Sequence, residues 1–218
     1  MRMNSDKLPT QITATNDGAE TAHVASQLLL FAYRNIKGSI LVNLGATLCL
    51  AFKFYTPSHM WLTIWWIGSV VAISVARLMF DIAFFRRAHH QTDFSPSFCK
   101  QWQMPISTGL LAVAAIWAVV SWIILDDLSR EDQYVFLIAI SAMAGGASGV
   151  LAPLRVTGKI YIGILLLSLS AKLLFLPHPE LMLAAMGFVF FTVMLISQDN
   201  NYKLLVQSLA LQEENSAL

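Results

Sequence analysis

Residues 60–80 read MWLTIWWIGSVVAISVARLMF, and the only charged side chain in this stretch is Arg77, close to its end. A helix of this length is about 30 Å long, which matches the hydrocarbon core of a bilayer. Other stretches of comparable length and hydropathy flank it. Together they predict an all-α polytopic membrane protein, a bundle of six transmembrane helices at residues 38–55, 60–80, 105–125, 134–153, 160–176 and 181–197.

The composition supports this class and excludes others. Hydrophobic residues make up 56% of the 218 residues, charged residues only 12%, and the mean hydropathy is +0.62. A soluble domain carries about a quarter charged residues. The formal net charge of +1 argues against nucleic acid as a partner, because binding phosphates requires clustered basic residues. The six spans leave little chain for a separate soluble domain.

The segments outside the spans divide the chain into three parts. Residues 1–24 are polar and lack the apolar core of a signal peptide, so they predict a disordered cytoplasmic tail. Residues 25–199 form the membrane domain, which opens with an amphipathic interfacial helix at residues 25–37. Residues 200–218 predict the start of a cytoplasmic signalling helix.

The orientation follows from the basic residues that flank the spans. Eight of them fall on one side and three on the other, and basic residues favour the cytoplasm. Both termini are therefore expected in the cytoplasm, with short outer loops. The eight are Arg34, Lys37, Arg86, Arg87, Lys100, Arg155, Lys159 and Lys203, and the three are Lys53, Arg130 and Lys172.

Residues 144–149 read AGGASG, which resembles the serine motif on the fourth span of rhomboid proteases. In that family a histidine of the sixth span activates the serine. Here the sixth span contains no histidine, and Ser148 lies near the cytoplasmic end of its helix, far from His178 in an outer turn. We therefore expect Gly145, Gly146 and Gly149 to pack helices closely instead, and we expect no catalytic residue in the chain.

A ligand pocket is the main functional possibility inside the bundle. Asn43 lies within the first span, where a buried amide needs a partner. The tryptophans of the second and third spans either line a hydrophobic pocket or anchor the helices at the interface. The pocket candidates are Asn43, Trp65, Trp66, Trp117 and Trp122. No cofactor is predicted, and an unidentified hydrophobic ligand or metal remains open.

Two pairs of titratable residues have alternative interpretations. Arg77 and Asp81 are four residues apart, so they share a helix face and form either an intrahelical salt bridge or a relay contact with another helix. His59 and His178 fall in outer turns near several carboxylates, where they are either solvated loop residues or weak metal-site candidates.

The C-terminal segment carries a heptad pattern. Leucines at positions 204, 211 and 218 occupy d positions, and Asn201 and Asn215 occupy a positions. This combination favours a parallel two-stranded coiled coil. It predicts a homodimer in which Leu204, Leu211 and Leu218 pack and the asparagines pair across the axis, with an uninterrupted helix from the sixth span.

Several loose motifs resemble the six-span sensory modules, grouped as MASE-type domains, that precede diguanylate cyclase (GGDEF) or histidine kinase domains in bacteria. The motifs are AYRN at 32–35, Asn43, ARL at 76–78 followed by Arg86 and Arg87, the Gly-rich fourth span ending in Ala152 and Pro153, and the final LQEENSAL. The resemblance implies a bacterial inner-membrane sensor that signals to an output domain in cis, which this chain does not contain. A small transporter or channel is the second hypothesis, and an intramembrane enzyme is the third.

Overall fold

The computed structural model describes residues 24–55, 60–89 and 95–216, except the side chains of Glu213, Glu214 and Ser216. The expectations for the tail, for His59 and for Leu218 therefore lie outside the described residues. The described part is all-α and contains six helices long and apolar enough to cross a membrane, so the predicted fold class is confirmed. They are α2 (Ile36–Lys53), α3 (Met60–Ala88), α4 (Pro96–Ile124), α5 (Arg130–Val150), α6 (Arg155–Leu174) and α7 (Leu181–Ser216).

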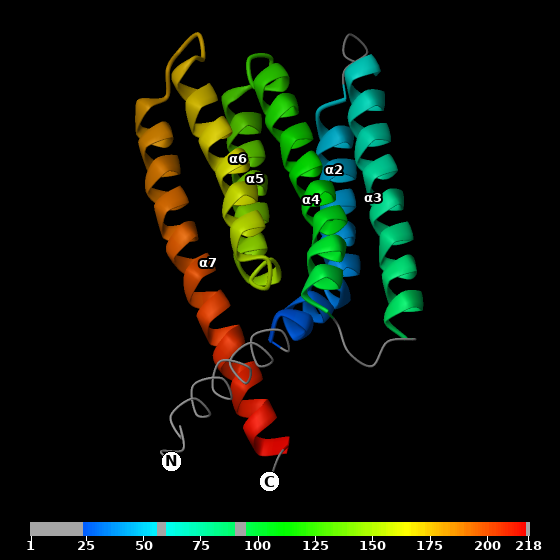
Figure 1. The fold of residues 1–218 in the computed structure, drawn as a ribbon. Coiled ribbons are helices and arrows are strands. Elements are labelled where there is room, and N and C mark those ends of the chain that lie inside the picture. The colour runs from blue at the N-terminus through cyan, green and yellow to red at the C-terminus, as the bar shows by residue number, and fades with distance from the viewer. Residues whose placement is uncertain (1–23, 56–59, 90–94, 217–218) are drawn as a thin grey trace, which may run out of the picture.

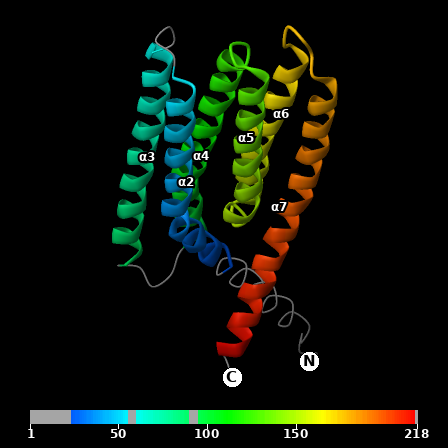
Figure 2. The same cartoon turned by 180° about the vertical axis from the view of Figure 1, so that it is seen from behind.

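The helices run alongside one another, with α2, α3 and α4 at one side of the bundle and α5, α6 and α7 at the other (Figures 1 and 2). The central contact is between α4 and α6, while α2 also reaches α5. The interior is built from residues with almost no exposure. Among them, the rings of Trp66 and Trp117 meet edge to face with centroids 5.1 Å apart.

Residues 24–34 form a further helical segment, which bends at Asn35 into α2. It lies at an angle below the bundle, at the same end as the C-terminal part of α7 (Figure 1). This segment corresponds to the helix predicted at residues 25–37. It also packs against the bundle. Tyr33 stacks on Phe84 at 3.9 Å and its hydroxyl donates to the carbonyl oxygen of Trp102, at 2.8 Å. The lead-in is thus fastened to α3 and α4.

Two helices begin earlier than the predicted spans, because each starts at a serine that caps its first turn. The helix α4 begins nine residues before the predicted span at 105, because Ser95 accepts a hydrogen bond from the backbone N–H of Phe98 and Pro96 suits the first helical position. Similarly, α5 begins at Arg130, where the hydroxyl of Ser129 accepts from the backbone N–H of Asp132. Pro105 then lies inside α4 without ending it.

The sixth span continues without interruption into the polar C-terminal segment, as the sequence predicts. The 36 residues of α7 give a helix about 54 Å long, well beyond the roughly 30 Å of a hydrocarbon core. Its C-terminal part projects past the other helices (Figure 1).

Candidate functional site

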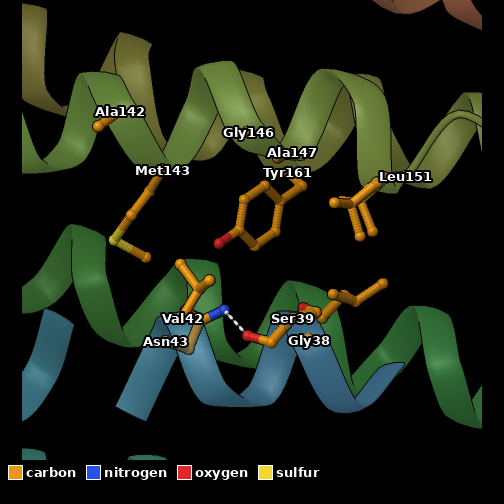
Figure 3. A pocket seen from close by; sticks show the side chains of 12 residues that line it. Gly38, Ser39, Val42, Asn43, Ala142, Met143, Gly146, Ala147, Leu151 and Tyr161 are labelled. Carbon is orange, nitrogen blue, oxygen red and sulfur yellow. Dashed lines mark hydrogen bonds between the residues drawn. The ribbon is translucent and has the colours of Figure 1, made fainter. Parts of the chain in front are cut away.

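A cavity of about 230 Å³ lies between α2 and α5 (Figure 3). Its mouth consists of exposed small or branched residues of these two helices, namely Gly38, Val42, Ala142, Gly146 and Val150. Its floor is buried. Leu110 of α4 and Tyr161 of α6 complete it, together with Asn43, Met143, Ala147 and Leu151. The cavity thus opens sideways, at the level of the membrane-spanning helices.

Asn43 is the one predicted pocket residue that lines this cavity. Its side chain is 5% exposed, and its amide Nδ2 donates to the carbonyl oxygen of Ser39 at 2.9 Å. Its Oδ1 has no hydrogen-bond partner among the described residues. The hydroxyl of Tyr161 points into the cavity toward Asn43 (Figure 3). Oδ1 of Asn43 is thus a buried, unpaired acceptor in the wall of the cavity.

Arg77 lies behind Ser39. It is 2% exposed, and its Nη2 donates to Oγ of Ser39 at 3.1 Å, while Nε and Nη1 find no partner in the described part of the chain. Arg77 borders a small void that shares Ser39, Leu151 and two further residues with the cavity. A buried charge without a counter-charge is strongly unfavourable, which marks this arginine as unusual.

Of the two alternatives for Arg77 and Asp81, the intrahelical salt bridge is not formed in the described structure, although both side chains are buried. Asp81 is 2% exposed, and its Oδ1 has no partner among the described residues. Arg77 instead lies along α4. A Cβ atom at Gly109 would come within 2.8 Å of its Cγ, so Gly109 makes room for the arginine side chain.

The four candidate tryptophans do not line the cavity. Trp66 and Trp117 are packed in the core, as described above. Trp65 and Trp122 are 46% and 42% exposed, and the indole of Trp122 donates to Oγ of Ser168 at 2.9 Å. Size and hydrophobicity alone do not distinguish a core or interface tryptophan from one that lines a pocket.

The glycines of α5 do not pack against another helix as the sequence suggested. A Cβ at Gly145, Gly146 or Gly149 would meet no atom of the described residues within 4 Å, the glycine's own helix backbone aside. Among the described residues of this chain, no close helix contact is formed at these three positions, and Gly146 lines the cavity. The tight positions are Gly109 and two others, Gly158 and Gly187, which face Gln198 and Ser170.

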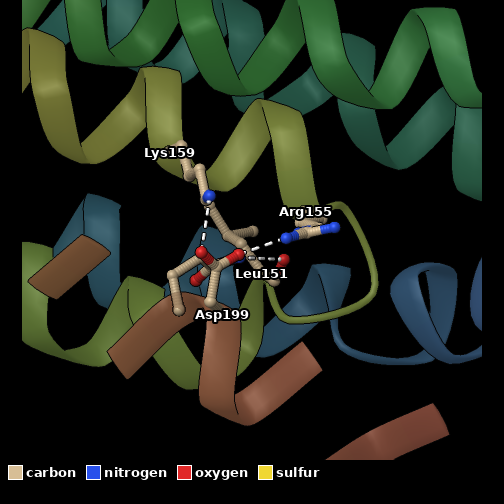
Figure 4. A network of polar contacts seen from close by, with 5 residues as sticks. Leu151, Arg155, Lys159 and Asp199 are labelled. Carbon is tan, nitrogen blue, oxygen red and sulfur yellow. Dashed lines mark hydrogen bonds and ion pairs between the residues drawn. The ribbon is translucent and has the colours of Figure 1, made fainter. Parts of the chain in front are cut away.

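A second cluster joins α7 to the α5–α6 connection (Figure 4). Asp199 accepts from Nε of Arg155 at 2.8 Å and from Nζ of Lys159 at 2.7 Å. Gln198 is completely buried, and its Nε2 donates to the carbonyl oxygen of Leu151 at 2.8 Å. We call the contacts of residues 197–202 with α5 and α6 the α7 junction.

Asn201, which the sequence predicts to pair across a dimer axis, contacts its own chain at this junction. Its Nδ2 donates to the carbonyl oxygen of Ser148 at 3.0 Å. Ser148 in turn donates its hydroxyl to the carbonyl oxygen of Gly145 at 2.8 Å, as expected of a structural serine. Asn215, by contrast, is exposed.

Leu204 and Leu211 are 63% and 60% exposed. Further exposed residues of α7 continue the same face toward the N-terminal end of the helix. They recur every three or four positions, from Asn200 back to Met182. At about 100° per residue, these positions fall within one sector of about 80° on the helix. The sector contains Met182, Met186, Val189, Val193, Ile196, Asn200, Leu204, Gln207 and Leu211, and we call it the α7 stripe.

The opposite end of the bundle is held by ion pairs. All three basic residues assigned to the outer side bind acids there: Lys53 with Asp132 at 3.0 Å, Arg130 with Glu180 at 3.6 Å, and Lys172 with Asp126 at 2.6 Å. No group of three metal-binding side chains occurs in the described part of the chain, which includes His178. Asp126, Asp132 and Glu180 therefore act as ion-pair partners in this structure.

Comparison of the chain with protein-family models, curated proteins and solved structures finds no match. What is shown is a multi-pass helical membrane protein with a lateral cavity and a long projecting helix. Sequence reasoning overlooked Ser39, Tyr161, Gln198 and Asp199. Of these, Asp199 could have been found, because it follows the last span on the same side as Arg155 and Lys159, which are four residues apart on one helix face.

Proposed function

We propose that this chain is a non-catalytic sensory and dimerisation module of the bacterial inner membrane, with both termini in the cytoplasm. In this proposal it relays a ligand or membrane signal to a cytoplasmic output domain in cis, a diguanylate cyclase or a histidine kinase. The resemblance noted in the sequence suggests that kind of output domain.

The observation that carries the proposal is the position of Leu151. Its side chain lines the cavity, and its carbonyl oxygen binds Gln198 of α7. A change in the cavity that moves Leu151 thus acts on the helix that leaves the bundle. The ion pairs of Asp199 hold the same point of α7, so that the helix moves with α5 and α6 as one body.

The α7 stripe supports the proposal that the chain forms a dimer. Within the bilayer an exposed apolar face is in contact with lipid, but Leu204 and Leu211 lie beyond the apolar span that ends near Ser197. Exposed leucines in water at a seven-residue interval favour pairing with an identical helix. Because Asn201 binds within its own chain, the seam predicted from the structure comprises Asn200, Leu204, Gln207 and Leu211.

The relay can be tested by changing the phase of the helix. In a chimera with a diguanylate cyclase domain joined after Leu218, one alanine inserted between Lys203 and Leu204 rotates the downstream helix by about 100°. Seven inserted alanines restore the phase to within about 20°. Cyclase activity should change severalfold with one residue and return close to the parent level with seven.

Equal activity of the parent and both insertion variants would contradict the relay. Monomeric chimera in bilayers would contradict the dimer, and a small transporter or channel would then become the leading interpretation. Inserting the alanines after Lys203 leaves the α7 junction intact, so the experiment tests transmission and does not disturb the bundle.

A further inference from the structure

The cavity between α2 and α5 opens through the side of the bundle, toward the bilayer. Its mouth is formed by Gly38 and Val42 of α2 and by Ala142, Gly146 and Val150 of α5, and all five residues are exposed. Both helices belong to the six that are long and apolar enough to cross a membrane. The molecules that meet the mouth are therefore lipids, whose hydrocarbon chains fill this layer.

The depth of the mouth corresponds to one leaflet of the bilayer. Gly38 lies near the start of α2 and Val150 is the last residue of α5, and these helix ends lie at the end of the bundle from which α7 projects (Figure 1). Along α5 the mouth extends from Ala142 to Val150, a rise of about 12 Å. Half of a hydrocarbon core of about 30 Å is about 15 Å. The mouth thus faces the chains of one leaflet, which is the cytoplasmic leaflet in the proposed orientation.

The lining behind the mouth is mostly hydrocarbon. Its polar groups on α2 already have protein partners, since Oγ of Ser39 accepts from Arg77 and Nδ2 of Asn43 donates to the carbonyl oxygen of Ser39. Oδ1 of Asn43 has almost no accessible surface, and the hydroxyl of Tyr161 points toward Asn43 (Figure 3). The apolar members of the floor are Leu110, Met143, Ala147 and Leu151. A charged ligand would therefore lose its hydration here without gaining a counter-charge, whereas an apolar chain would not.

The size of the cavity suits part of one hydrocarbon chain. A cavity of roughly 150 Å³ holds benzene in an engineered protein core, so about 230 Å³ has room for about nine carbon atoms. Water is a poor occupant, because an apolar cavity offers it too few hydrogen-bond partners. A chain that enters from the bilayer gains no hydrophobic free energy, but it supplies van der Waals partners to the atoms of the lining.

We propose that this cavity binds the end of one acyl chain of a phospholipid from the adjacent leaflet. The chain enters between Val42 and Gly146, where a Cβ atom on the glycine would meet no atom of the described residues within 4 Å, the glycine's own helix backbone aside. It ends against Leu110, Met143 and Tyr161 in the floor. The headgroup stays at the membrane surface.

A bound lipid chain is the membrane signal that the proposed sensory function requires, and its role as a signal rests on that function. The chain would lie beside Leu151, whose carbonyl oxygen binds Gln198 of α7. Binding itself is measured without any output domain. A chain bound in the cavity together with a failed relay would contradict only the proposed function, and a cavity that binds no chain would contradict only this inference.

The experiment uses the full chain in nanodiscs that contain a photoreactive phosphatidylglycerol. One probe carries a diazirine near the end of an acyl chain and the other carries it in the headgroup, and mass spectrometry maps the adducts. Met143 and Tyr161 are at most 7% exposed, so lipid that only surrounds the bundle does not reach them. Val71 and Val75 are exposed on α3 and report lipid at the outer surface. We expect the chain probe to label all four residues and the headgroup probe to leave Met143 and Tyr161 unlabelled.

Two substitutions assign the adducts to the cavity. Gly146→Leu places a side chain in the mouth and should reduce labelling of Met143 and Tyr161 severalfold, while labelling of the two α3 residues stays the same. Gly145→Leu is its matched control, because Gly145 is the neighbouring glycine, does not line the cavity and also has open space around it among the described residues. It should leave all adducts unchanged.

Several results would overturn the proposal. Labelling of the α3 residues without any adduct at Met143 or Tyr161 in the unaltered chain would show that no chain enters. Equal labelling of these two floor residues by the headgroup probe would exclude recognition of the chain end. Identical floor labelling in Gly145→Leu and Gly146→Leu would show that the chain reaches the floor by another route. The comparison of the two probes needs no substitution, so it decides the matter even if a variant does not fold.

Discussion

The carbonyl oxygen of Leu151 accepts a 2.8 Å hydrogen bond from Nε2 of Gln198, while the side chain of Leu151 lines the cavity between α2 and α5. Gln198 is completely buried, and it fits beside α6 because residue 158 is glycine. One residue on the α5–α6 connection thus contacts both the cavity and the helix that leaves the membrane.

This arrangement predicts a coupled pair of substitutions. Gln198→Ala should cost about 1 kcal/mol of stability, because it removes a buried hydrogen bond to the carbonyl of Leu151, which then keeps only the backbone N–H of Leu154 as a donor. Gly158→Ala should cost more, since its Cβ would approach Cδ of Gln198 to 2.8 Å. Combining the two should recover most of the Gly158→Ala loss, because the shortened side chain removes the clash. Thermal unfolding in nanodiscs measures the stability of the two single variants and the double variant. Strictly additive losses of stability would show that the two residues do not interact.

The ion pairs of Asp199 should hold the cytoplasmic part of α7 against α6. Asp199→Asn weakens both contacts, so amide hydrogen exchange should rise around residues 155–160 and 197–202. The matched control is Asp132→Asn, which breaks the contact with Lys53 at the opposite end of the bundle and should leave these two segments unchanged. Unaltered exchange in Asp199→Asn would show that the junction depends on Gln198 and Asn201 alone.

The orientation predicted from the basic residues can be measured by cysteine labelling. In a variant with Cys49 and Cys99 replaced by alanine, a cysteine at Val156 should react only with reagent in the cytoplasm. A cysteine at Glu131, which is exposed at the other end of the bundle, should react only from outside. Labelling with the opposite sidedness would invert the topology and place Leu204 and Leu211 outside the cell.

The sequence predicts the six helices well because a span depends on a local property, about twenty consecutive apolar residues. The ends were less predictable. Ser95 and Ser129 are capping residues, and their effect becomes visible only when the following backbone N–H groups are located.

The candidate site was predicted only in part, since its members come from four helices. Asn43 stands out within its own span, but Tyr161 and Gln198 acquire their roles from the packing of α6 and α7. The glycines of α5 show the same limit. Their pattern indicates that backbones can approach closely, yet the structure leaves open space at Gly146 and places the close contacts at Gly109 and Gly158.

The central claim is that α7 carries a signal as half of a parallel dimer, and disulfide cross-linking in native bilayers tests it most directly. Single cysteines are introduced into the Cys-free variant at Leu204 and Leu211, on the α7 stripe, and at Val206 and Leu209, which lie on the other side of the helix at about 100° per residue.

The account predicts rapid cross-linking between chains at Leu204 and Leu211 and little at Val206 and Leu209. Equal cross-linking at all four positions, or none at any of them, would contradict it.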